Sequence, residues 1–193
     1  MATTAIQLGS RESEKTQVER ISLKDFLLNY SDMEDGYKYE WNDGAIEKSA
    51  TMNQAQTAIW SILLPLFFKT QTFKNGGILI SETDMKTSET QLRRPDIAIY
   101  TGEQIPFMKK GQNQVAPWVA EVISENDNIN KVESKKDEYF EAGVKVVWHI
   151  FPESKKVYVY TAPDKVKICT GSTICESEPA LGDFKISADA LFA

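Results

Sequence analysis

The sequence predicts one α/β domain built on a mixed central β-sheet flanked by helices. The chain has 193 residues, of which 41% are hydrophobic and 26% are charged, a composition typical of a globular domain with a sizeable core. Its apolar patterns follow the order helix, several strands, helix, strands, and no repeat, linker or low-complexity tract interrupts them. We therefore expect a single domain over residues 20–193, preceded by a loose arm over residues 1–19.

The first half of the chain carries the signals of two helices and several short strands. Ser22 can cap the first helix, and Asn42-Asp43-Gly44 is a turn typical of β-hairpins. Pro65 is expected to bend or divide the second helix. The expected elements are a helix over 22–27, hairpin strands over 37–41 and 45–47, a helix over 53–69, and strands over 77–80, 84–87 and 95–100.

The second half begins with a strongly apolar strand, which a polar loop separates from an amphipathic helix. Gly143 can end that helix in the left-handed conformation. Cys169 and Cys175 flank a turn and are expected in one short hairpin, where a disulfide is geometrically possible; in a reducing compartment we expect two free thiols. The expected elements are a strand over 115–123, a helix over 130–142, strands over 145–151 and 156–161, a hairpin over 169–175 and a helix over 188–192.

Bulk properties restrict the location and the partners. No apolar run is long enough to span a bilayer, and the first 20 residues lack the apolar stretch of a signal peptide, so we expect a cytoplasmic protein without a membrane partner. The formal net charge of −6 argues against a protein that coats DNA electrostatically. An acidic cleft that receives a metal ion remains compatible with this charge.

Two carboxylates stand in otherwise apolar strands, and they are the first candidates for chemistry. Asp96 precedes Ile97-Ala98-Ile99, and alternation places Glu121 on the face of its strand that Val119 and Ile123 share. A buried carboxylate is costly unless a cation, a hydrogen-bond network or a raised pKa compensates. Two such acids on neighbouring strands could share one hard cation, or each could form a structural ion pair with Arg93, Arg94 or a lysine; the residues alone favour neither interpretation.

Lysines on the helix after Glu121 are the second set of candidates. On a helical wheel Val132, Tyr139, Phe140 and Ala142 share one side, whereas Ser134, Asp137, Glu138 and Glu141 are expected to face water. Lys135 and Lys136 both flank the apolar side, from which a long side chain can reach water or turn toward the two carboxylates. Periodicity does not choose between them, and Lys131 also stays open.

These residues, in this order, resemble the PD-(D/E)xK nuclease superfamily and, within it, the Uma-type restriction endonuclease family. The resemblance covers roughly residues 22–160 and implies a restriction-endonuclease-like fold. It departs from the superfamily at Ile123, where a lysine is usual, and at 53–56, where the family often has a histidine. The motifs that carry it are Tyr39-Glu40, Asp43-Gly44, Pro95-Asp96, Glu121-Val122-Ile123-Ser124, Lys135 four residues before Tyr139, Tyr139–Val144 and Trp148–Pro152.

The resemblance implies a Mg²⁺- or Mn²⁺-dependent endonuclease that hydrolyses phosphodiester bonds in nucleic acid, with DNA the expected substrate. Asp96, Glu121 and the carbonyl of Val122 would hold the metal, and Glu40 could complete the ligand set. Lys135 would orient the attacking water or stabilise the negative charge that develops on the phosphate. A homodimer or higher homo-oligomer is expected, because cutting both strands of a duplex takes two active sites.

Two alternative functions stay open. The chain could be a catalytically inactive module of nuclease fold that binds a partner, or a small-molecule enzyme with Glu121 as general base.

The remaining polar and aromatic side chains are not expected to form a second site. His149 is the only histidine, which excludes a histidine-based metal site, and it is expected to be structural. Arg93 and Arg94 could touch phosphates but are expected on the solvated surface. Trp118 and Trp148 are expected in the core.

Overall fold

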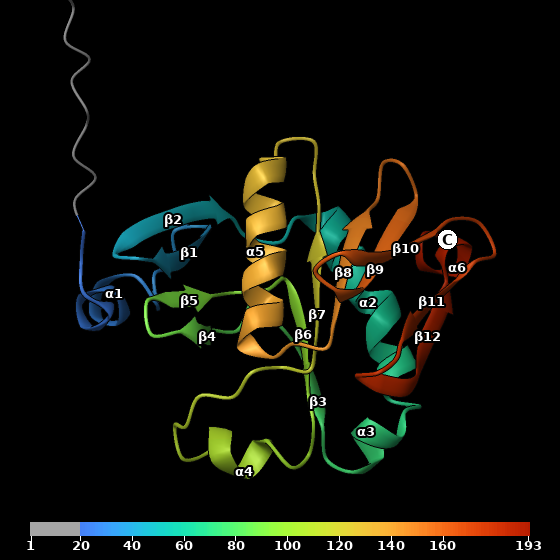
Figure 1. Cartoon of the computed structure of the whole chain (residues 1–193), viewed down its shortest axis with the longest axis horizontal. Helices are drawn as coiled ribbons and strands as arrows, with labels where there is room; N and C mark the ends of the chain where they lie inside the picture. Colours follow the sequence, from blue (N-terminus) through green and yellow to red (C-terminus); the bar gives the residue numbers. More distant parts are fainter. Residues whose placement is uncertain (1–19) are drawn as a thin grey trace, which may run out of the picture.

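A computed structural model of the chain describes residues 20–193; the expected N-terminal arm, residues 1–19, lies outside them. Two sheets carry most of the structure (Figure 1). The larger sheet has the strand order β10-β9-β8-β7-β6-β3 and the smaller one the order β2-β1-β5-β4. The strands of the larger sheet are β3 (Ile78–Ser81), β6 (Ile97–Tyr100), β7 (Trp118–Val122), β8 (Val146–Phe151), β9 (Lys156–Ala162) and β10 (Lys165–Cys169).

The larger sheet is mixed, as the sequence predicts. Strands β7 and β8 are parallel, whereas all its other neighbours pair antiparallel. The parallel pair needs a crossover connection, and helix α5 (Ile129–Ala142) provides it. Gly143 ends this helix with a φ of 107°, in the left-handed region that favours glycine.

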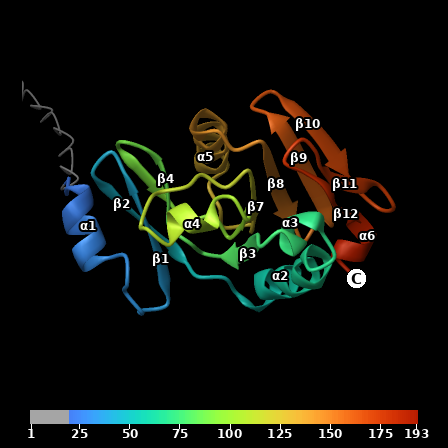
Figure 2. The ribbon, with the colours of Figure 1, turned by 90° about the horizontal axis from the view of Figure 1, so that it is seen from below.

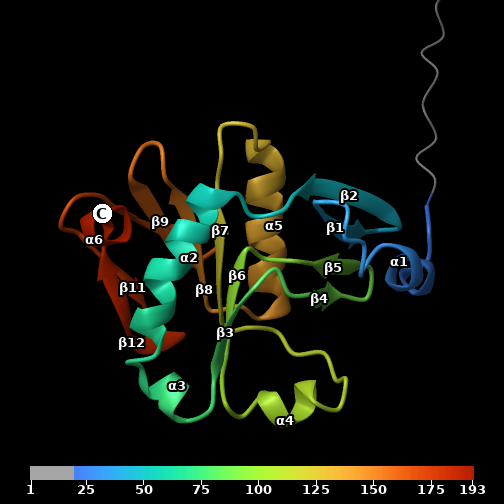
Figure 3. The same cartoon turned by 180° about the vertical axis from the view of Figure 1, so that it is seen from behind.

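Helices cover both faces of the larger sheet. Helix α5 lies on one face and α2 (Gln54–Phe67) on the other, as the views from the front, from below and from behind show (Figures 1, 2 and 3). Trp118 and Trp148 are fully buried on the α2 side, and Tyr139 of α5 is fully buried on the opposite side. Each face of the sheet therefore has its own apolar core.

Pro65 lies inside α2, which continues to Phe67. Three short helices complete the central part of the chain and its C-terminal end: α3 (Gln71–Lys74), α4 (Ile105–Met108) and α6 (Ala188–Leu191). No helix among residues 20–193 is long and apolar enough to cross a membrane.

The smaller sheet is built on the predicted hairpin. Its strands are β1 (Tyr37–Asn42), β2 (Ala45–Ala50), β4 (Met85–Ser88) and β5 (Gln91–Arg93). Residues of β1 alternate between the two faces: Tyr39 and Trp41 belong to a small core with Phe26 of helix α1 (Leu23–Asn29). Lys38 and Glu40 consequently point the other way, toward the larger sheet.

The cysteine hairpin was predicted incorrectly. Cys169 ends β10, which pairs with β9, whereas Cys175 lies in β11 (Ile174–Ser177), which pairs with β12 (Leu181–Ser187). The turn between the two cysteines therefore links two sheets. The expectation of free thiols agrees with the structure, in which both side chains are buried and unbridged.

Candidate active site

A cleft of about 810 Å³ lies between the two sheets, where β1, β7 and α5 meet. Its lining includes all the candidate residues: Glu40, Asp96, Glu121, Val122 and Lys135. Asp96 and Glu121 come together through strand register. Because Ile97 of β6 faces Ala120 of antiparallel β7, Asp96 stands opposite Glu121.

Asp96 is fixed by both of its carboxylate oxygens. The backbone N–H of Val122 donates to Oδ2 at 2.8 Å, and the Lys38 ammonium donates to Oδ1 at 2.6 Å. The carbonyl of Val122, the predicted backbone ligand, accepts a hydrogen bond from the Gln56 side chain at 2.9 Å. Gln56 lies at the start of α2, in the segment where the resembled family often has a histidine.

Lys135 is the lysine of α5 that reaches the carboxylates. Its Nζ lies 2.7 Å from Oε1 of Glu40 and 2.9 Å from Oε1 of Glu121. Lys136 instead donates to Glu133 and to the carbonyl of Pro163. Lys131 is exposed at the rim, 4.0 Å from Glu47. Among the described residues, Lys135 is the only one of the three candidate lysines that contacts the carboxylates Glu40 and Glu121.

Glu121 and Glu40 share this lysine but have different environments. Burial raises the pKa of Glu121, and the negative charge of Asp96 adds to the effect against the opposing charge of Lys135. The Tyr139 hydroxyl donates to the same carboxylate at 2.5 Å. Burial would also raise the pKa of Glu40, but Lys135, Lys38 and Arg93 outweigh it and lower that pKa to about 2. Glu40 is therefore held as a carboxylate, whereas Glu121 takes up a proton more readily.

Arg93 was expected on the surface and is instead buried, with 3% of its area exposed. It donates to both oxygens of Glu138 at 2.6 and 2.7 Å and also to Glu40 and Glu47. The prediction that Glu138 faces water was therefore wrong: its side chain turns from α5 toward β5. A bidentate arginine joins the helix that carries Lys135 to the strands that carry Glu40.

The charges of this network leave an excess of one negative charge when every group is ionised. Five carboxylates contact four cationic groups, namely Lys38, Lys135 and Arg93 in the cleft and the exposed Lys131 at its rim. A cluster with a negative excess favours the binding of a further cation. Among residues 20–193, however, no three Asp, Glu, His or Cys side chains are grouped closely enough to bind a metal by themselves.

The donor chemistry nevertheless fits Mg²⁺. This ion prefers oxygen ligands, keeps several of its waters and is usually bound by one or two carboxylates. Asp96 and Glu121 offer two carboxylates on adjacent strands, and the Val122 carbonyl is a third oxygen beside them. Because Mg²⁺ needs few protein ligands, these oxygens fit the ion although the described part of the chain has no larger carboxylate cluster.

Known proteins resemble this chain in family and in fold. The sequence model of Uma2, described as "Putative restriction endonuclease", matches residues 23–189. The chain belongs to the Uma2 family. No curated protein matches it. A solved structure, that of a putative nuclease belonging to DUF820 from Anabaena variabilis ATCC 29413, aligns with a TM-score of 0.69 at 18% identity, covering 80% of this chain and 89% of the other.

Membership of Uma2 confirms the family resemblance read from the sequence, and the structural match confirms the restriction-endonuclease-like fold. Sequence reasoning did not identify four polar residues of the site: Lys38, Gln56, Arg93 and the hydroxyl of Tyr139. A signal existed for Lys38, because it shares the face of β1 with Glu40. The resemblance pointed to the segment 53–56 and the sequence offered Arg93 as a phosphate contact, but their actual contacts depend on distant segments that meet only in the fold.

Proposed function

We propose that this member of a nuclease family is a Mg²⁺- or Mn²⁺-dependent endonuclease that hydrolyses phosphodiester bonds of DNA. The observation that carries the proposal is the convergence of Asp96, Glu121 and Lys135 in one cleft. Lys135 lies 2.9 Å from Glu121, and Asp96 is tied to the backbone of the residue after Glu121. Two carboxylates can hold a metal ion that activates a water, and an adjacent ammonium can stabilise the charge that develops on a phosphate.

Each residue has a role that its position supports. Asp96 and Glu121, with the carbonyl of Val122, would hold the metal, which when bound polarises the scissile phosphate and lowers the pKa of a water. The Lys135 ammonium would orient that water or stabilise the negative charge that develops on the phosphate. Glu40, held ionised, keeps the Lys135 ammonium in the cleft and could complete the ligand set. Arg93 fixes Glu40 through the hydrogen bond to its Oε2.

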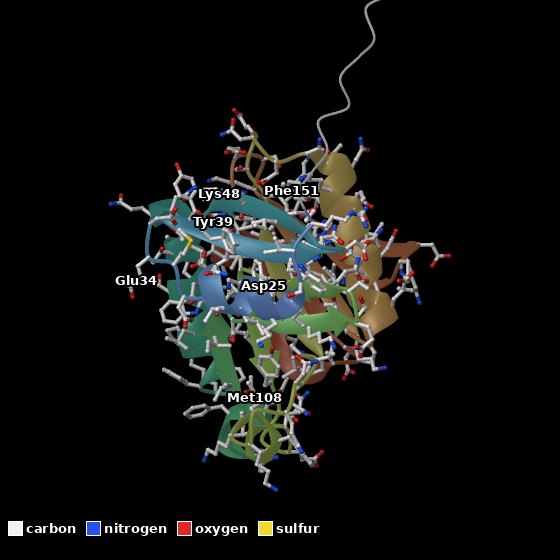
Figure 4. All side chains as sticks on the ribbon, turned by 90° about the vertical axis from the view of Figure 1, so that its left-hand side faces the viewer. Asp25, Glu34, Tyr39, Lys48, Met108 and Phe151 are labelled. Carbon is white, nitrogen blue, oxygen red and sulfur yellow. The ribbon has the colours of Figure 1, made fainter. Side chains whose placement is uncertain are left out.

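The rim of the cleft suits a phosphate backbone. Lys131 is exposed there. Lys48, labelled beside Tyr39 in Figure 4, lies on the other face of the β1–β2 hairpin, where its Nζ is over the Tyr37 ring and near Asp35. A basic side chain at the rim of an acidic centre would draw a polyanion toward the carboxylates despite the net charge of −6.

The test is cleavage of supercoiled plasmid, with linear duplex, single-stranded DNA and RNA as parallel substrates. The wild-type protein should cut DNA with Mg²⁺ or Mn²⁺ and not with EDTA, and Asp96→Ala should show no cutting above the metal-free background. Asp164→Ala is the matched control, because it removes an exposed carboxylate in the turn between β9 and β10. Cutting by Asp96→Ala at the wild-type rate would refute the proposal.

One observation favours the second candidate, a non-catalytic nuclease-fold module. Both oxygens of Asp96 are already engaged, one of them by the Lys38 ammonium. Under this alternative a titration with Mg²⁺ or Mn²⁺ shows no saturable site, and wild-type protein cuts none of the four substrates. Light scattering on the same samples tests the homodimer or higher oligomer that we propose for duplex cutting.

A further inference from the structure

Lys38 lies in the cleft and contacts a proposed metal ligand, yet the proposed reaction assigns it no role. It is 6% exposed, and its Nζ lies 2.6 Å from Oδ1 of Asp96. Burial would lower the pKa of Lys38, but the charges of Asp96, Glu121 and Glu40 outweigh burial and raise it. The side chain is therefore a cation fixed among three carboxylates.

The Lys38 ammonium occupies an oxygen of Asp96 that a bound metal ion would use. Oδ2 of Asp96 accepts the Val122 N–H, which fixes the plane of the carboxylate and leaves Oδ1 as the oxygen for a cation. An ammonium and a divalent ion on the same oxygen repel each other, and in a buried site this repulsion is poorly screened. Both cations cannot make their best contact with Oδ1 at once.

We propose that Lys38 is a built-in cation that competes with the divalent metal ion for Oδ1 of Asp96 and so limits metal affinity. This inference rests on the proposed function, because it takes Asp96 as a metal ligand. Lys38 is a positioning residue in the metal-free protein: it holds Asp96 in place and compensates its charge. When metal binds, the ammonium must leave Oδ1, and its long side chain keeps it in the cleft, where a substrate phosphate is an alternative partner.

Calorimetric titration with Mn²⁺ tests the competition directly. Lys38→Met leaves Asp96 without its cation, so this variant should bind Mn²⁺ at least about tenfold more tightly than wild type, about 1.4 kcal/mol. Lys48→Met is the matched control. It removes an exposed lysine of the same hairpin that pairs with Asp35, and it should bind Mn²⁺ as wild type does. Equal or weaker binding by Lys38→Met would overturn the inference.

A second measurement on the wild-type protein does not depend on whether Lys38→Met folds. A buried, hydrogen-bonded ammonium exchanges its protons slowly enough to give an NMR signal, which Lys38→Arg identifies by its loss. Titration with Mg²⁺ should move or abolish the Lys38 signal in step with the shift of the Val122 amide. A Lys38 signal that stays unchanged while the Val122 amide saturates would also overturn the inference.

The two proposals fail differently. If wild type binds metal and cuts DNA while Lys38→Met shows unchanged Mn²⁺ affinity, the proposed function stands and the competition is wrong. If neither wild type nor Lys38→Met binds Mn²⁺, both the metal site and the competition are wrong.

Discussion

Lys135 and Lys136 are neighbours on α5, yet their side chains leave the helix toward different partners. Lys135 contacts two carboxylates of the cleft, whereas Lys136 contacts Glu133 and the carbonyl of Pro163. Both are largely buried, and in each case nearby carboxylates outweigh burial and raise the pKa of the ammonium. Because the partners of Lys136 lie outside the carboxylate cluster, the two lysines are a useful pair for mutation.

We predict that Lys135→Met lowers the rate of metal-dependent DNA cleavage roughly 100-fold or more, because a cation positioned at developing charge contributes on that scale. Lys136→Met should cleave at a rate close to that of wild type. Single-turnover cleavage at saturating Mg²⁺ measures both, and circular dichroism checks that each variant is folded. Equal losses in the two variants would contradict the assignment of Lys135.

At the residue scale, sequence reasoning identified the acids and reduced the lysine to a few candidates. Asp96 and Glu121 were visible because a carboxylate in an apolar strand breaks the local pattern. Lys135 and Lys136 were not separable, since adjacent helix positions differ by about 100° and both flanked the apolar side. Which of the two turns inward depends on where β1 places Glu40, and that is a long-range property.

At the element scale, α5 is held over the cleft by a charge network as well as by apolar contacts. Tyr139 anchors it in the core, and Glu138 binds Arg93 of β5 through two hydrogen bonds. The same arginine contacts Glu40 of β1 and Glu47 of β2. Arg93 therefore sets the distance between the helix that carries Lys135 and the hairpin that carries Glu40.

We predict that Arg93→Met lowers the free energy of unfolding by about 3–5 kcal/mol, because it leaves the largely buried Glu138 without its cation and removes one of the cations that contact the buried Glu40. Arg94→Met should cost less, about 1–2 kcal/mol, since Arg94 pairs with a single, partly exposed carboxylate, that of Asp84, and donates one hydrogen bond to the Ser31 carbonyl. Urea denaturation compares the two variants. A similar small loss in both would show that the Arg93 network contributes little.

Most elements that position the site could be predicted, because their signals are local. The hairpin turn at Asn42-Asp43-Gly44, the apolar strand β7 and the Gly143 helix end each follow from a few adjacent residues. The pairing of β10 with β9 and of β11 with β12 could not be predicted correctly. A turn signal such as Thr170-Gly171-Ser172 shows that the chain reverses but not which sheet each side joins.

At the scale of the whole molecule, both faces of the larger sheet carry an apolar core, and the carboxylate cluster lies at the edge of the core on the α5 side. The α2 side holds the paired tryptophans Trp118 and Trp148, with ring centres 5.1 Å apart. The α5 side holds Glu121 and, directly opposite it in register on β8, His149. His149 is 1% exposed, and neither ring nitrogen has a hydrogen-bond partner among the described residues.

His149 should make the stability of the whole domain depend on pH. Burial lowers its pKa to about 4 from an ordinary value of 6.5, with the positive charges of Lys136 and Lys135 assisting and Glu133 opposing. The unfolded chain therefore binds a proton that the folded chain does not, and stability falls as the pH drops from 6.5 toward 4. The Tyr160 ring lies 5.0 Å from the His149 ring, centre to centre, and carries no charge that would stabilise a protonated imidazole.

We predict that wild type loses about 2 kcal/mol more unfolding free energy than His149→Phe between pH 7 and pH 5, as linkage requires for this change in pKa. The raised pKa of Glu121 acts on stability in the opposite direction, because the folded chain then binds the proton more tightly than the unfolded chain. It affects both proteins alike, so the difference between them isolates His149. Urea denaturation at the two pH values gives the four free energies, and parallel losses would mean that the imidazole is protonated within the fold.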